Sequence, residues 1–184
     1  MQSEPLRKWG SSILVVLLLF LLQTSVLPYF SFGKAVPNLL VMITCCFAIL
    51  RGERDGIYTG FACGVLLDAF YMNVVGIHAL IYLYIGYVCG LAHSHYEEQD
   101  ARMPLIVIVL GDLAALFMEY LLFYVLRGNF CFRFYLSRIM IPEVLYTLVM
   151  AVLIFPLLVI LERRFVSPPA ETQTEKLSDL EEEA

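Results

Sequence analysis

Residues 56–96 read GIYTGFACGVLLDAFYMNVVGIHALIYLYIGYVCGLAHSHY and contain a single formally charged residue, Asp68. A helix that crosses the hydrocarbon core of a bilayer needs about 20 mostly apolar residues and satisfies its own backbone hydrogen bonds. This stretch is long enough for two such helices joined by a tight turn at residues 72–74. An acid inside a bilayer is expensive, so Asp68 requires an explanation. The stretch therefore predicts a membrane protein.

The composition of the whole chain supports the same class. Hydrophobic residues make up 60% of the 184 positions, the mean hydropathy is +0.79, and 16% of residues are charged. The net charge of -5 belongs to the C-terminal segment, because residues 167–184 hold six acids and one base. The remainder of the chain is neutral. The charge balance therefore gives no support for a nucleic-acid partner.

Charge-poor runs bounded by turn signals predict six membrane-spanning helices. The second and third are short, so we expect them not to be fully exposed to lipid. A turn at residues 51–55 is expected between these two. The predicted fold class is an all-α bundle of six transmembrane helices in residues 1–166, followed by a disordered acidic cytoplasmic tail at residues 167–184. The six helices are placed at residues 11–30, 36–50, 56–71, 75–95, 103–127 and 137–162.

The basic residues in the loops predict the orientation. The first apolar run has no cleavage pattern after it, so we expect it to remain as an uncleaved helix. Cytoplasmic loops carry the excess of lysine and arginine, which favours both termini inside. On that reading the inner side holds Arg7, Lys8, Arg51, Arg54, Arg102, Arg163, Arg164 and Lys176, and the outer side holds Lys34, Arg127, Arg133 and Arg138.

Two pairs of glycines four residues apart lie in the third and fourth predicted helices. Gly60 and Gly64 share a helix face with Asp68, and Gly86 and Gly90 repeat the spacing. Small residues at this spacing let two helix backbones approach closely in a membrane. Contacts within one bundle explain the glycines most simply, and docking of a helix from another protein is the alternative.

Asp68 lies near the outer end of the third predicted helix, and His78 lies on the first turn of the fourth. We expect the Asp68 carboxylate to accept hydrogen bonds from the free amides at the start of the fourth helix, near residues 75–78. Ligand binding or proton transfer at Asp68 is the alternative. His78, which several tyrosines follow, is interpreted as a polar anchor rather than a catalyst.

The fifth and sixth predicted helices carry three further acids. Asp112 and Glu119 are seven residues apart, close to two helical turns, so both share a face that we expect to point into the bundle. Glu143 lies early in the sixth helix. These acids and the one in the third helix are expected to line a polar cavity open to one side. Candidate basic partners on the outer side are Arg127 and Arg138.

Catalytic and metal-binding motifs are missing from this sequence. It contains no Gly-x-Ser-x-Gly, no His-Glu-x-x-His and no paired aspartates in a GxGD setting, so an intramembrane hydrolase is disfavoured. The cysteines form no CxxC pair, and those in predicted helices are interpreted as packing residues. His93 and His95 flank a solvated loop, so neither a metal site nor a cofactor is expected.

The outer loop before the sixth predicted helix mixes aromatic residues with arginines. Aromatics at every second position suit an extended or kinked segment at the level of the lipid headgroups. The same mixture is common in protein interfaces, which is the alternative interpretation. The residues concerned are Arg127, Phe130, Phe132, Arg133, Phe134 and Arg138.

An ordered set of short motifs resembles the rod shape-determining protein MreD family. They are Pro37-Asn38-Leu39-Leu40, Arg51-Gly52-Glu53, GFACGVLLDAF at residues 60–70 and GIHALIYLYIGYVCG at residues 76–90. The similarity covers the first four predicted helices well and the last two by length and topology. The long acidic tail departs from the family's pattern.

The resemblance implies a multi-pass protein of the bacterial inner membrane with no enzymatic activity. It implies direct binding of MreC, in a complex with MreB, RodA and a transpeptidase penicillin-binding protein, among membrane lipids. The implied role is scaffolding and regulation of lateral peptidoglycan synthesis, and hence of cell shape. The implied architecture is similar to that of the substrate-binding subunits of energy-coupling-factor transporters. A membrane-embedded subunit that binds a vitamin or lipid in the acid-lined cavity is the alternative function.

The acidic tail offers no apolar face that could pack against the bundle. We therefore expect deletion of residues 168–184 to leave membrane insertion unchanged, as measured by membrane fractionation of the truncated and full-length chains. Loss of insertion in the truncated chain would show that the tail takes part in folding.

Overall fold

The computed structural model describes residues 3–30, 36–71, 76–96, 102–122 and 132–165, and every element within these ranges is helical. The all-α class predicted from the sequence is confirmed, and each of the six predicted segments lies largely in a helix. The α-helices are α1 (Ser3–Leu21), α2 (Leu39–Arg51), α3 (Glu53–Tyr71), α4 (Ile77–Leu91), α5 (Arg102–Tyr120), α6 (Phe132–Tyr135) and α7 (Ile141–Phe165). Shorter π and 3-10 turns are η1 (Leu22–Val26), η2 (Leu27–Phe30), η3 (Ala92–His95) and η5 (Leu136–Met140).

Three of the described helical segments are long and apolar enough to cross a membrane, at Ile77–Ser94, Arg102–Tyr120 and Arg133–Leu161. Ser12–Val26 and Leu39–Arg51 are shorter apolar helices. Helix α3 has 19 residues but carries acids in its first turn as well as Asp68 further along. These helices identify the chain as a membrane protein.

Helix α2 forms the core of the bundle. Its residues from Leu39 to Ile49 are all buried, and it contacts α1, α3, α4, α5 and α7. Its 13 residues extend only about 20 Å, less than the roughly 30 Å of a hydrocarbon core. Because its neighbours surround it, α2 can be hydrophobic on every side without meeting lipid. The expectation that this short helix is shielded is confirmed.

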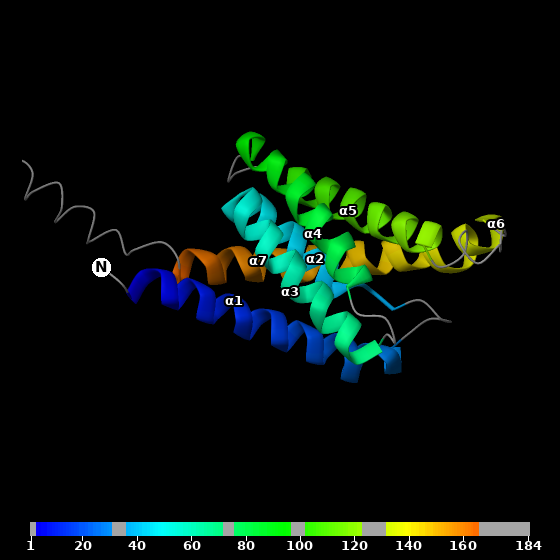
Figure 1. The fold of residues 1–184 in the computed structure, drawn as a ribbon, viewed down its shortest axis with the longest axis horizontal. Helices are drawn as coiled ribbons and strands as arrows, with labels where there is room; N and C mark the ends of the chain where they lie inside the picture. Colours follow the sequence, from blue (N-terminus) through cyan, green and yellow to red (C-terminus); the bar gives the residue numbers. More distant parts are fainter. Residues whose placement is uncertain (1–2, 31–35, 72–75, 97–101, 123–131, 166–184) are drawn as a thin grey trace, which may run out of the picture.

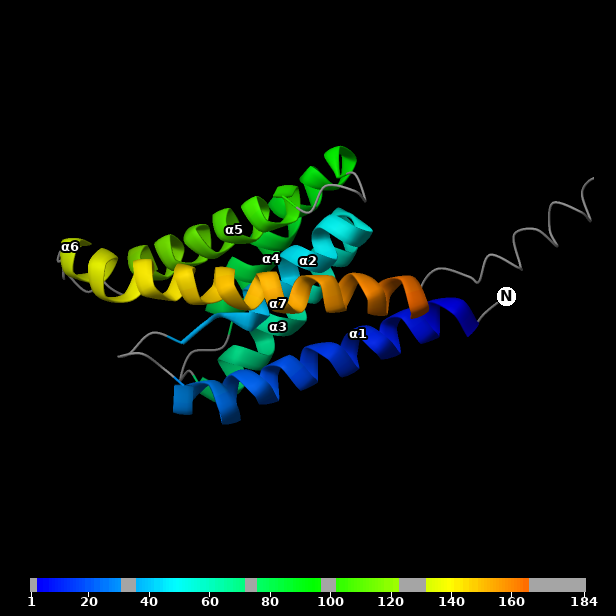
Figure 2. The ribbon, with the colours of Figure 1, turned by 180° about the vertical axis from the view of Figure 1, so that it is seen from behind.

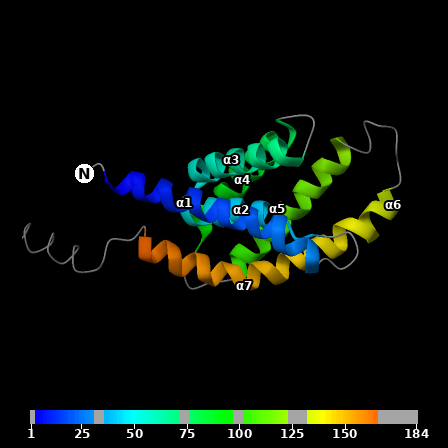
Figure 3. The same cartoon turned by 90° about the horizontal axis from the view of Figure 1, so that it is seen from below.

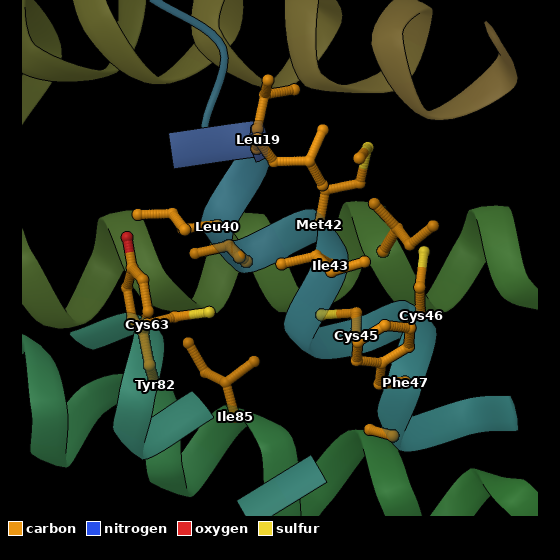
Figure 4. Packing of buried hydrophobic residues seen from close by; sticks show 14 of the residues in the cluster. Leu19, Leu40, Met42, Ile43, Cys45, Cys46, Phe47, Cys63, Tyr82 and Ile85 are labelled. Atoms are coloured by element: carbon orange, nitrogen blue, oxygen red, sulfur yellow. The ribbon is translucent and has the colours of Figure 1, made fainter. Parts of the chain in front are cut away.

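Figure 4 shows how the neighbouring helices pack on α2. Leu19 of α1 lies at one end of the cluster, and Cys63 of α3 and Tyr82 and Ile85 of α4 lie on the opposite side of the helix. The four cysteines in the described helices are buried and free, as expected of packing residues. The thiols of Cys45 and Cys89 are 3.5 Å apart. Sulfur here fills space between α2 and α4.

A single residue separates α2 from α3. Gly52 has φ of 99°, a conformation that glycine adopts without steric cost, and its amide donates to the Ala48 carbonyl. The five-residue turn expected at residues 51–55 is therefore wrong. Helix α3 starts at Glu53, and acids in its first turn suit the positive end of the helix.

Helices α3 and α4 pack backbone against backbone (Figure 3). A Cβ added at Gly60, Gly64, Gly86 or Gly90 would collide with the backbone of the other helix of the pair, and Gly56 lies in the same contact. In lipid no hydrophobic force drives helices together. The close approach of α3 and α4 provides van der Waals contact, which holds the helices together instead. The glycines serve a contact within one bundle.

Helices α5 and α7 run beside one another and reach past the rest of the bundle at the end where α6 lies (Figures 1 and 2). Helix α1 begins and α7 ends at the opposite end of the molecule. The Arg51 guanidinium at the end of α2 donates to the Ser12 hydroxyl, which places Arg51 near that same end. One end of the bundle therefore holds α6, and the other holds the start of α1, the end of α7 and Arg51.

The segment around α6 is helical, so the extended or kinked conformation expected before the sixth predicted helix is wrong for residues 132–136, whereas residues 137–140 belong to that predicted helix. Tyr135 and Met140 lie on one face and pack with Leu116 and Tyr120 of α5, with the two tyrosine rings 5.1 Å apart. A helix satisfies its own backbone while presenting this face to its neighbour, which an extended segment could not do. The alternation of aromatic residues did not reveal this face.

The α3–α4 contact predicts a large effect of a single methyl group. Gly64→Ala should lower the stability of the detergent-solubilised protein by about 1–3 kcal/mol, because the new Cβ meets the backbone of Ala79. Gly10→Ala is the matched control, since nothing lies within 4 Å of a Cβ there. Thermal unfolding should leave Gly10→Ala near or slightly above the wild type. Equal melting temperatures for both variants would refute the packing assignment.

Candidate functional site

Asp68 caps the N-terminus of α4. Its side chain is fully buried, and its Oδ2 accepts hydrogen bonds from the amides of Gly76 at 2.7 Å and Ala79 at 3.2 Å, while Oδ1 accepts from the His78 amide at 3.2 Å. The first amides of a helix have no partner within the helix, and its positive end favours an anion. The role expected from the sequence, a carboxylate that caps the fourth helix, is what the structure shows.

His78 links Asp68 to α5. Its Nδ1 lies 2.7 Å from Asp68 Oδ1, and its Nε2 lies 3.6 Å from Glu119 Oε1. Because a carboxylate can only accept, Nδ1 carries the hydrogen and donates it to Asp68. The ring is buried and stands edge-on to Tyr82. We call this series of contacts the Asp68–His78–Glu119 chain.

A second polar group surrounds the start of α2. The Asn38 amide side chain lies 2.8 Å from the Tyr82 hydroxyl, and the Asn38 backbone N–H donates to Thr147 Oγ1 at 3.2 Å. Asn38 Oδ1 also accepts from the Val41 amide, which makes Asn38 the N-cap of α2. Three separate parts of the chain, namely residue 38, α4 and α7, thus meet in one buried network.

Asp112 and Glu143 complete the polar region. Asp112 is fully buried in α5, close enough to Thr147 and Glu119 to interact with both electrostatically. Glu143, on the first turn of α7, is partly buried and lies within electrostatic range of Asp112 and Glu119. The acids predicted to share a region of the bundle therefore do so, and Asp68 reaches them through His78.

Of the two basic partners expected for these acids, the one that the structure describes does not contact them. Arg138 is exposed in η5 and forms no ion pair with the acids among the described residues, while Arg127 lies outside the described ranges. His78 is the only basic group in contact with an acid in this part of the bundle, counting described residues. The region is therefore rich in acids and poor in cations.

The described residues of the predicted outer loop do not join this region. Arg133 and Phe134 are exposed on α6, where Phe134 shows 65% of its surface. Phe132 begins α6, and Phe130 lies outside the described residues. Exposed aromatic and arginine side chains here are compatible with either interpretation made from the sequence, a position at the lipid headgroups or a protein contact.

The Asp68–His78–Glu119 chain resembles part of a catalytic triad but lacks a nucleophile. In a serine hydrolase the nitrogen that faces away from the carboxylate meets a hydroxyl, whereas here His78 Nε2 meets a second carboxylate. No group of three or more His, Cys, Asp or Glu side chains in the described part of the chain is placed to hold a metal ion. What the arrangement can do is stabilise the ends of helices and hold positive charge.

Sequence reasoning missed Asn38, Tyr82 and Thr147 as members of the site. Asn38 was detectable, because an asparagine that follows a proline and precedes an apolar run is a typical N-cap. Tyr82 and Thr147 gave no local signal, since a tyrosine or threonine in an apolar helix is common. Only the packing of α4 and α7 against the start of α2 brings them together.

Comparison with known proteins identifies a family. A family model described as rod shape-determining protein MreD matches residues 4–165 of the chain. No curated protein and no solved structure matches it. The matched range spans every helix from α1 to α7.

The cap at the start of α4 predicts graded effects at Asp68. Asp68→Leu removes the acceptor for three amides and should lower stability by at least about 2 kcal/mol, because each unsatisfied buried group costs about 1–3 kcal/mol. Asp68→Asn keeps one acceptor oxygen and should lose less. Hydrogen–deuterium exchange should localise the change to residues 76–80.

The control for this series is Asp55→Asn at the start of α3, which should cost less than about 1 kcal/mol because it removes only a helix-end interaction. If Asp68→Leu exchanged no faster at residues 76–80 than Asp55→Asn, the capping role would be wrong.

Proposed function

We propose that this chain is a non-enzymatic membrane scaffold and regulator of lateral peptidoglycan synthesis, because it belongs to the rod shape-determining protein MreD family. The observation that carries this proposal is the family match across residues 4–165, which covers the bundle from α1 to α7. The role in rod-shape determination follows from the family itself. The partners and the mechanism described below are more specific than the family match and belong to the proposal.

We infer that the chain crosses the bacterial cytoplasmic membrane six times, with both ends in the cytoplasm. Three helical segments are long enough to cross by themselves, and the shorter α2 is shielded by its neighbours. Helix α1 begins and α7 ends at the same end of the bundle, which supports an even number of crossings. The excess of basic residues in the loops on that side supports its assignment to the cytoplasm.

MreC is the proposed direct partner, with MreB, RodA and a transpeptidase penicillin-binding protein in the same complex. The single membrane helix of MreC would dock on the bundle and bias the synthase toward its active state. The glycine faces of α3 and α4 are already occupied by one another. We therefore place the MreC contact on another surface of the bundle, one that offers exposed apolar side chains.

A second function is favoured by the acid-rich region. An architecture similar to the substrate-binding subunits of energy-coupling-factor transporters would place a ligand site between helices, and several acids lie between α4, α5 and α7. A ligand-binding role would not exclude scaffolding. The two are distinguished by what is purified with the protein.

The proposed function is tested by expressing the chain with the MreC of the same genome in a rod-shaped bacterium depleted of its own MreD. Restored rod shape and co-purification of MreC are the expected results. Gly10→Ala should behave as the wild type, whereas Gly64→Ala should lose both activities in parallel with its stability.

Round cells that contain a folded, membrane-inserted chain without bound MreC would contradict the proposal. Co-purification of transporter ATPase subunits, with a small molecule retained in the mass spectrum, would instead identify the chain as a ligand-binding subunit.

A further inference from the structure

Asp112 is the fully buried carboxylate of the described acid-rich region whose two oxygen atoms have no hydrogen-bond partner among the described residues. The Thr147 hydroxyl lies beside the carboxyl but does not meet hydrogen-bond geometry. A bare carboxylate inside a membrane bundle is costly, so something must balance its charge.

The helix amides near Asp112 are already engaged. At the start of α2 the Asn38 amide donates to Thr147, the Leu40 amide to Gln23 Oε1, and the Val41 amide to Asn38 Oδ1. The start of α4 is capped by Asp68. The positive ends of both helices thus have other acceptors.

His78, the basic group that contacts two acids of this region, is engaged as well. His78 directs one ring nitrogen to Asp68 and the other to Glu119. Glu119 and Glu143 only add negative charge within electrostatic range of Asp112. The surroundings of Asp112 therefore call for an additional positive charge.

The groups around Asp112 offer oxygen atoms to such a charge. Thr147 Oγ1 accepts one hydrogen bond from Asn38 and keeps a second lone pair. The Tyr82 hydroxyl, hydrogen-bonded to Asn38, also lies within electrostatic range of Asp112. Carboxylate, hydroxyl and amide oxygens are the ligands of hard cations.

The backbone beside this region has the form that ion sites in membrane proteins often take. Helix α2 begins inside the protein after the non-helical residues 36–38, of which Pro37 and Asn38 are buried. Non-helical backbone at membrane depth occurs only where protein or a polar cavity surrounds it, and coupling-ion sites are commonly built at such breaks.

We propose that Asp112 binds a monovalent metal cation, with the hydroxyl groups of Thr147 and Tyr82 supplying further oxygen atoms. A monovalent ion would balance the single charge of the Asp112 carboxylate, and no group of three or more His, Cys, Asp or Glu side chains among the described residues converges on one point. The ion would join α5 to α7 and to α4. Its occupancy would then govern how firmly these elements pack.

The test is the thermal stability of the purified full-length protein in sodium, potassium and choline chloride at equal ionic strength and fixed pH. A bound ion stabilises the folded state by mass action. We expect sodium or potassium to raise the melting temperature over choline by on the order of 5 °C. Isothermal calorimetry with the effective salt, titrated into protein in choline, should show saturable binding.

Asp112→Asn keeps the size of the side chain and removes its charge, so it should abolish the difference between salts and the calorimetric signal. Thr147→Ser should retain the difference, and Thr147→Val should reduce it. Glu53→Gln, an exposed acid at the start of α3, is the control and should behave as the wild type.

The proposal is overturned if the wild-type melting temperature is the same in all three salts. It is also overturned if the salt difference persists in Asp112→Asn, because the ion would then bind elsewhere. A stability that changes with pH equally in all three salts would identify a proton as the neutralising charge and exclude the metal cation. Each result is independent of whether the chain binds MreC.

Discussion

The direct backbone contact between α3 and α4 is the constraint on which the rest of the structure depends. Glycines on both helices leave no side chain at the points of closest approach, so the two helices come nearer than alanines at these positions would allow. Asp68 shares the face of Gly60 and Gly64, and the same approach therefore brings its carboxylate onto the first amides of α4. A packing feature thus also satisfies a helix end that lipid would leave without partners.

The polar groups of the bundle likewise satisfy the ends of helices and connect neighbouring helices. Asp68 caps α4, Asn38 caps α2, and His78 and Thr147 connect these caps to α5 and α7. The contacts of Asn38 with Thr147 and of His78 with Glu119 join elements that are far apart in the sequence. Buried polar networks of this kind specify one arrangement of helices, because a shifted arrangement would leave donors or acceptors unsatisfied.

These contacts have consequences for how the protein can act as a scaffold. The small-residue faces, which in membrane proteins often receive a partner helix, are used up within the bundle. A partner must therefore recognise the outer faces of the helices or the projecting end where α5, α6 and α7 meet. The protein would then present a stable surface to its partners, and the balance of charge around Asp112 would decide how stable that surface is.

The sequence by itself determined the membrane class, the positions of the helices and the cap at Asp68. These features depend on residues close together in the chain, since helical periodicity, charge-poor runs and the short distance from Asp68 to α4 are all local. It did not determine that Gly52 alone makes the turn after α2, or that residues 132–136 are helical.

Only the tertiary structure decided which of the other acids in the bundle acquire partners. Asn38 and Thr147 are 109 residues apart, and the contact between His78 and Glu119 joins α4 to α5. Whether a buried carboxylate is paired depends on groups that packing brings from distant helices. For this reason the cap formed by Asp68, whose partners are close in the sequence, could be predicted, whereas the lack of a hydrogen-bond partner for Asp112 could not.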